Sequence, residues 1–234
     1  MTYIAFSNGS AFDEFAEIDR QIALGKANEI VQRILPRHGI KAFGSSRKET
    51  AAHEAAHAII YAAEGLPVVS ASLSEIEVPA GPFGVIPFCS GWTECPNRQS
   101  LTPFSPISDD ERYLRQTLAG WVGEVFALSR QKVRLGSSLD ERIAAGMLAG
   151  RIYRRTGSQI EGVLAEQYAI IYATLRNNRH IHNAVTKTLA RKSILQAEEL
   201  KQLLADVKPL SKPSSIDFDQ AMDVAPMLFL ISRL

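Results

Sequence analysis

Residues 46–63 carry the feature that most constrains the fold. Ser46 followed by Glu49 forms a capping-box pattern, in which the hydroxyl and the carboxylate each satisfy a backbone N–H of a helix's first turn. An alanine-rich run follows, and the sequence Gly65-Leu66-Pro67 ends it. The pattern predicts a helix over Arg47–Ala63, and its small side chains let neighbouring backbone approach closely.

This predicted helix contains the sequence His53-Glu54-Ala55-Ala56-His57. Residues at positions i and i+4 lie one turn apart on the same helix face, so both imidazoles can bind one cation. Two imidazoles, one carboxylate and an open fourth position are typical of a catalytic zinc site. Glu54 lies about 100° around the helix from His53, where it can take a proton from metal-bound water. We therefore predict one Zn²⁺ ion per chain, held by His53 and His57, with Glu54 as the general base.

A zinc site of this type needs a third protein ligand from elsewhere in the chain. Two downstream carboxylates are candidates, Glu124 and Asp140. Their spacing from the histidines does not choose between them, so both remain open at this point.

The order of these blocks resembles the peptidase domain of the FtsH family of ATP-dependent zinc metalloproteases. The resemblance covers about Arg47 to Leu204. Residues 53–58 are similar to the family's HEAGHA, residues 118–124 to LGGRAAEE and residues 136–140 to GASND. Residues 66–68, 178–179 and 196–200 also match the family in order. Ala56 and Trp121 are departures, because the family has glycine and arginine there.

The resemblance implies roles for particular residues. The last residue of GASND is the family's third zinc ligand, which implies Asp140 here. Glu124 would then orient a ligand histidine by accepting its second N–H. The implied activity is zinc-dependent endopeptidase hydrolysis of peptide bonds in a polypeptide substrate.

The family's ATPase module has no counterpart in this sequence. The 44 residues before the resemblance are too few for that module, and no phosphate-binding GxxxxGK[ST] loop occurs. We therefore expect cleavage of flexible or unfolded segments, or dependence on a separate ATPase or unfoldase. Because the family's peptidase domains form hexameric rings, a homo-oligomer is a further expectation. The alternative is a zinc-binding regulatory or interaction module with vestigial peptidase activity, although retention of Glu54 favours the enzyme.

The predicted fold is mainly α, with a small β element beside the helix that carries the histidines. We divide the chain into an N-terminal helix and linker (1–44), a peptidase domain (45–207), and a C-terminal linker with a short apolar segment (208–234). Apolar spacing predicts further helices at Phe15–Leu35, Asp109–Arg130, Leu139–Arg155, Gln159–Asn177, His180–Arg191 and Gln196–Val207. Val68–Val78 is the candidate edge strand for binding a peptide.

Composition excludes some other classes of protein. Lys and Arg number 26 against 25 Asp and Glu, so the chain lacks the large net positive charge that favours binding of nucleic acid. No apolar run is long enough to cross a membrane, and no signal peptide is evident. Cys89 and Cys95 fit ordinary reduced thiols better than a disulfide framework or a zinc finger. A cytoplasmic location is the default expectation.

Overall fold

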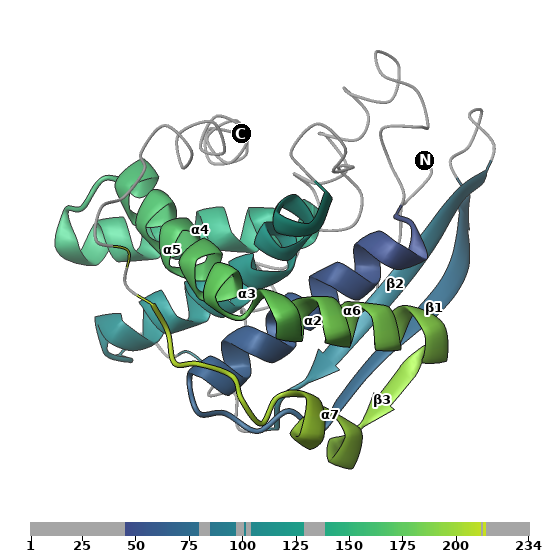
Figure 1. Ribbon diagram of the computed structural model, residues 1–234. Helices are drawn as coiled ribbons and strands as arrows, with labels where there is room; N and C mark the ends of the chain where they lie inside the picture. Colours follow the sequence, from purple (N-terminus) through teal and green to yellow (C-terminus); the bar gives the residue numbers. More distant parts are fainter. Residues whose placement is uncertain are drawn as a thin grey trace.

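A computed structural model describes residues 45–79, 85–96, 101, 104–128, 139–211 and 213. Within these residues the chain is mainly helical, with one small antiparallel sheet of three strands (Figure 1). The predicted fold class is therefore confirmed at this level. The predicted helix at Phe15–Leu35 and the apolar segment near the C-terminus lie outside the described residues.

The helices follow the sequence signals closely. They are α2 (Arg47–Ala63), α3 (Ile107–Leu128), α4 (Leu139–Thr156), α5 (Ile160–Asn177), α6 (Arg179–Lys192) and α7 (Ala197–Leu203). The capping box at the start of α2 is formed, since Ser46 Oγ accepts from the Glu49 N–H at 3.3 Å and Glu49 Oε2 accepts from the Ser46 N–H at 2.6 Å. Among the described residues, no helix is both long and apolar enough to cross a bilayer.

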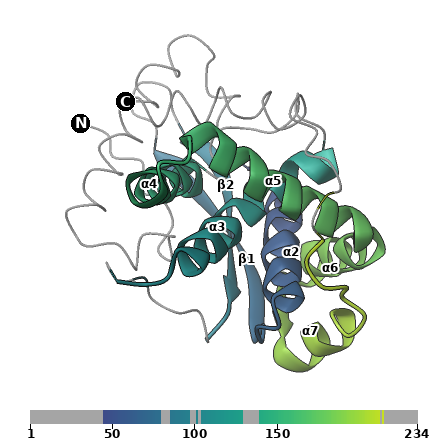
Figure 2. The ribbon, with the colours of Figure 1, turned by 90° about the vertical axis from the view of Figure 1, so that its left-hand side faces the viewer.

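Helix α2 lies at the centre of the fold. It packs along strands β1 (Ser70–Pro79) and β2 (Val85–Glu94) on one side and against α3, α5 and α6 on the other (Figures 1 and 2). Every residue from Glu49 to Tyr61 is buried. A Cβ atom on Gly123 of α3 would lie only 2.4 Å from the Ala56 Cβ, so the two helices meet almost backbone to backbone. This contact explains why α2 is built from alanine.

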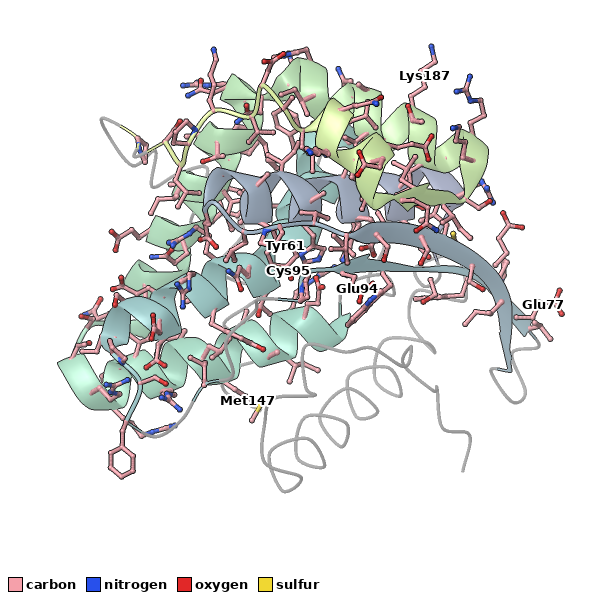
Figure 3. The ribbon with its side chains drawn as sticks, turned by 90° about the horizontal axis from the view of Figure 1, so that it is seen from below. Tyr61, Glu77, Glu94, Cys95, Met147 and Lys187 are labelled. Carbon is pink, nitrogen blue, oxygen red and sulfur yellow. The ribbon has the colours of Figure 1, made fainter. Side chains whose placement is uncertain are left out.

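The strand order is β2-β1-β3, and all neighbours are antiparallel. Strand β1 pairs with β2 along its whole length and with β3 (Ile194–Gln196) over Ser70–Ser72. The prediction that Val68–Val78 forms the edge strand is wrong over Ser70–Ser72, because β3 pairs there with the side of β1 opposite β2. The edge strand that lies against α2 is β2. Figure 3 shows β1 and β2 extending beyond α2, with Glu77 toward their far end.

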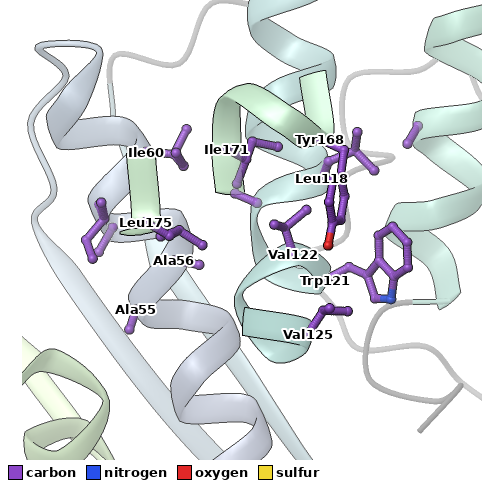
Figure 4. Close-up of a cluster of buried hydrophobic side chains, with 14 of the residues drawn as sticks. Ala55, Ala56, Ile60, Leu118, Trp121, Val122, Val125, Tyr168, Ile171 and Leu175 are labelled. Carbon is purple, nitrogen blue, oxygen red and sulfur yellow. The ribbon is translucent and has the colours of Figure 1, made fainter. Parts of the chain in front are cut away.

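The hydrophobic core joins α2, α3 and α5. Figure 4 shows Ala56 and Ile60 of α2 on the side of that helix toward Leu118 and Val122 of α3 and Ile171 of α5. Trp121 lies in the same cluster, with its ring centroid 5.9 Å from that of Tyr168. The guanidinium of the buried Arg142 lies 5.1 Å from the Trp121 ring centroid, a cation–π contact between α4 and α3. This packing fixes α3 and α4 around the histidine-bearing face of α2.

Candidate metal centre

Three buried side chains from two helices converge on one point. His53 and His57 of α2 bring their Nε2 atoms to 3.1 Å from each other. Glu141, in the first turn of α4, brings its Oε1 atom to 3.2 Å from His53 Nε2 and 2.9 Å from His57 Nε2. The side chains are only 7%, 9% and 15% exposed, respectively. This group could hold a metal ion.

The spacing of the three atoms fits a small tetrahedral cation. Ligand atoms about 2.1 Å from a tetrahedral zinc ion lie roughly 3.4 Å from each other. The distances here are 2.9, 3.1 and 3.2 Å, so the site is contracted only slightly from that geometry. Two imidazole nitrogens and one carboxylate oxygen are also the donor set of many catalytic zinc sites.

Glu141 is the carboxylate that sequence reasoning missed. The prediction named its neighbour Asp140, whose backbone lies in α4 but whose side chain is outside what the structure describes. The role of Asp140 as a ligand thus remains a prediction, while Glu141 is the acidic side chain in contact with both histidines.

Glu124 contacts the opposite side of the His53 ring. Its Oε1 atom lies 2.7 Å from His53 Nδ1, and its side chain is fully buried. A carboxylate oxygen accepts a hydrogen bond, so His53 Nδ1 donates to Glu124 and leaves Nε2 as the ring nitrogen that would bind a metal ion. This is the contact that orients a ligand histidine in metal sites.

The electrostatics of this cluster favour a cation. Burial by itself lowers the pKa of His53, but the nearby carboxylates of Glu141 and Glu124 outweigh burial and raise that pKa well above its ordinary value. Burial likewise raises the pKa of Glu141, and the two histidines reverse this effect and hold that pKa below its ordinary value. Without a metal, the carboxylates therefore favour the charged form of the His53 imidazole; a divalent ion would replace that proton.

Glu54 lies beside the cluster and is held from strand β2. The Thr93 hydroxyl donates to Glu54 Oε2 at 2.7 Å, and both side chains are buried. Burial raises the pKa of Glu54, and the positive charge of His53 and His57 together with the Thr93 hydrogen bond offsets only part of this rise. A carboxylate with an increased proton affinity next to a metal site is suited to general-base chemistry.

Helix α2 is also held from α6 by a buried histidine. His182 Nε2 donates to the Ala52 carbonyl at 3.0 Å, so this ring is neutral with its proton on Nε2. Burial lowers the pKa of His182 to about 4, and the hydrogen bond to Ala52 offsets part of this shift. The unfolded chain, with an ordinary pKa near 6.5, takes up a proton that the folded chain excludes until about pH 4.

We therefore expect folding stability to fall as the pH drops from about 6.5 to 4. Between pH 7 and pH 5, His182 should account for a loss of about 2 kcal/mol in the free energy of unfolding. Urea unfolding at the two pH values, for wild type and His182→Gln, measures this contribution as the difference in pH dependence. The other titrating groups contribute the same pH dependence to both proteins, so their contributions cancel in that comparison. An equal pH dependence in the two proteins would contradict the expectation.

A scan of protein-family models gives no match, and no curated protein matches the sequence closely enough to count as related. Cys89 and Cys95 are not joined in a disulfide bond.

Proposed function

We propose that this chain is a zinc-dependent metalloendopeptidase that hydrolyses peptide bonds in flexible or unfolded polypeptide segments. The observation that carries the proposal is the position of Glu54, which Thr93 holds beside the group formed by His53, His57 and Glu141. Zinc binding alone does not require Glu54, but hydrolysis requires a base at that position. The resemblance to FtsH peptidase domains supports the same activity.

In this mechanism His53, His57 and Glu141 would hold the zinc ion, and Glu124 would keep His53 in the correct tautomer. The bound ion supplies Lewis acidity and a water molecule of lowered pKa. Glu54 takes the proton from the attacking water and later delivers it to the leaving amine. Burial of Glu54 raises its pKa toward the range in which it can both accept and return a proton.

The outer side of β2 is the proposed binding edge for the substrate backbone. Cys89 directs its N–H to the Ser45 carbonyl, at 3.2 Å, rather than to β1. Backbone groups alternate in direction along a strand, so those of Gly91 and Thr93 point to the same side as those of Cys89. Ser45 forms an isolated parallel bridge with Phe88 on that side, and within the described ranges no strand pairs with β2 there over Gly91 to Thr93. An extended peptide can add there as a strand and pass Glu54.

This binding mode requires an extended substrate segment, which folded domains rarely expose. We therefore propose flexible segments as the substrates of the isolated chain. A separate ATPase or unfoldase would be needed for folded proteins.

Hydrolysis of casein and of a fluorogenic peptide tests the proposed function. We expect one zinc ion per chain, loss of activity with a chelator, and recovery when zinc is restored. Glu54→Gln should keep its zinc and lose activity by about 100-fold or more, because it removes the base and leaves the ligands. Glu166→Gln, which changes an exposed carboxylate on α5, is the matched control and should behave as wild type. Equal activity with and without the Glu54 carboxylate, or no activity despite bound zinc, would instead support a zinc-binding module.

A further inference from the structure

Two residues of β2, Gly91 and Thr93, contact the Glu54 carboxylate where α2 packs against the sheet. The Thr93 hydroxyl donates to Glu54 Oε2 at 2.7 Å, and its oxygen also lies 3.1 Å from the Glu54 backbone carbonyl. A Cβ atom on Gly91 would lie 2.3 Å from Glu54 Oε1, so the carboxylate rests directly on the glycine backbone. Both oxygens of Glu54 are therefore in close contact with this one strand.

We propose that Thr93 is a positioning residue for Glu54, fixing the carboxylate through the hydrogen bond to Oε2 in the place from which it exchanges the proton. This inference rests on the proposed function. A glutamate side chain has three rotatable bonds, and fixing them costs conformational entropy that a well-placed donor offsets. Gly91 limits the position of the carboxylate on the other side, because any side chain there would occupy its place.

The same two residues connect the base to the proposed substrate edge. Thr93 and Gly91 turn their side-chain positions toward Glu54, and their backbone groups point to the outer side of β2. A peptide bound along that side is thereby set in register with the carboxylate by a single rigid strand. The hydroxyl of Thr93 thus positions the carboxylate of Glu54 in addition to filling space in the core.

The test separates the hydroxyl from the shape of the side chain. Thr93→Val keeps the shape and removes the donor, whereas Thr93→Ser keeps the donor and removes a methyl group. We expect Thr93→Val to lower kcat by about tenfold or more with KM within about twofold of wild type, and Thr93→Ser to retain most of the wild-type kcat. Zinc content should be the same in all three proteins. Wild-type kcat in Thr93→Val, or an equal loss in Thr93→Ser, would overturn the proposal.

Crystal structures of zinc-loaded wild type and Thr93→Val give a second readout that does not depend on activity. We expect Glu54 to be ordered against Thr93 in wild type and displaced or disordered in the valine variant. If wild type is inactive, the proposed function fails, yet the position of Glu54 still decides whether Thr93 holds it. An unchanged Glu54 in Thr93→Val, or a wild-type Glu54 that makes no contact with Thr93, would overturn the proposal. The wild-type structure serves this purpose even if Thr93→Val does not fold.

Discussion

Glu141→Gln should lose zinc, whereas Asp140→Asn should retain it. Glu141 Oε1 is in contact with both Nε2 atoms, so its negative charge is the one that a bound cation meets directly. Glutamine has the same shape but no charge, and its amide is a much poorer zinc ligand. Loss of a group that hydrogen-bonds to a metal ligand typically lowers metal affinity by about 10- to 100-fold, and we expect Glu141→Gln, which changes a ligand itself, to exceed that range.

Zinc titration against a competing chelator, at fixed pH, measures both variants on one scale. The two residues are neighbours in the first turn of α4, which makes Asp140→Asn a close control for changes in helix charge. The resemblance to FtsH peptidase domains implies the opposite result, with Asp140 as the ligand. Tight zinc binding by Glu141→Gln together with loss in Asp140→Asn would therefore reassign the third ligand to Asp140.

The difference between these two residues illustrates what a sequence can specify. His53 and His57 belong to one helix, whose regular geometry fixes their separation once the capping box and the alanine run identify it. Glu141 lies 84 residues from His57 and reaches it only through the packing of α4. A shift of α4 by one residue would bring a different carboxylate to the site. The local sequence does not indicate which residue of α4 faces the two histidines.

The sheet gives a second example. The alternating apolar pattern predicted a strand after Pro67, and β1 forms there from Ser70. The order of the strands depends on β3, whose three residues, Ile194–Gln196, are too few to show alternation. This segment was predicted partly as the start of the last helix. In the order β2-β1-β3 the strand β1 is central, and the edge strand beside Glu54 is β2.

Gly120→Ala should eliminate the metal centre, although alanine is the better helix former. Gly120 lies in α3, where alanine is worth about 1 kcal/mol more than glycine by helix propensity alone. A Cβ atom at this position, however, would lie 2.2 Å from Nε2 and 2.3 Å from Cε1 of His53. The imidazole would have to leave its place between Glu124 and Glu141, and the zinc site would lose one of its two histidines.

Gly162→Ala provides the matched control. Gly162 is also helical, in α5, and no atom outside its own helix lies within 4 Å of the position of its Cβ. We expect this variant to bind zinc as wild type does and to be slightly more stable, by up to about 1 kcal/mol. Zinc content and urea unfolding of the metal-free proteins measure both effects.

A double-mutant cycle identifies His53 as the group with which the new methyl collides. In wild type, Gly120→Ala should destabilise the metal-free protein by about 1–3 kcal/mol, as overpacking of a buried site does. In a His53→Ala background the ring is gone, so the same substitution should become neutral or stabilising. An unchanged cost in that background would mean that the close approach of α3 to α2 depends on other contacts. If instead Gly120→Ala binds zinc normally, the position of His53 Nε2 beside Gly120 is not the one that binds metal.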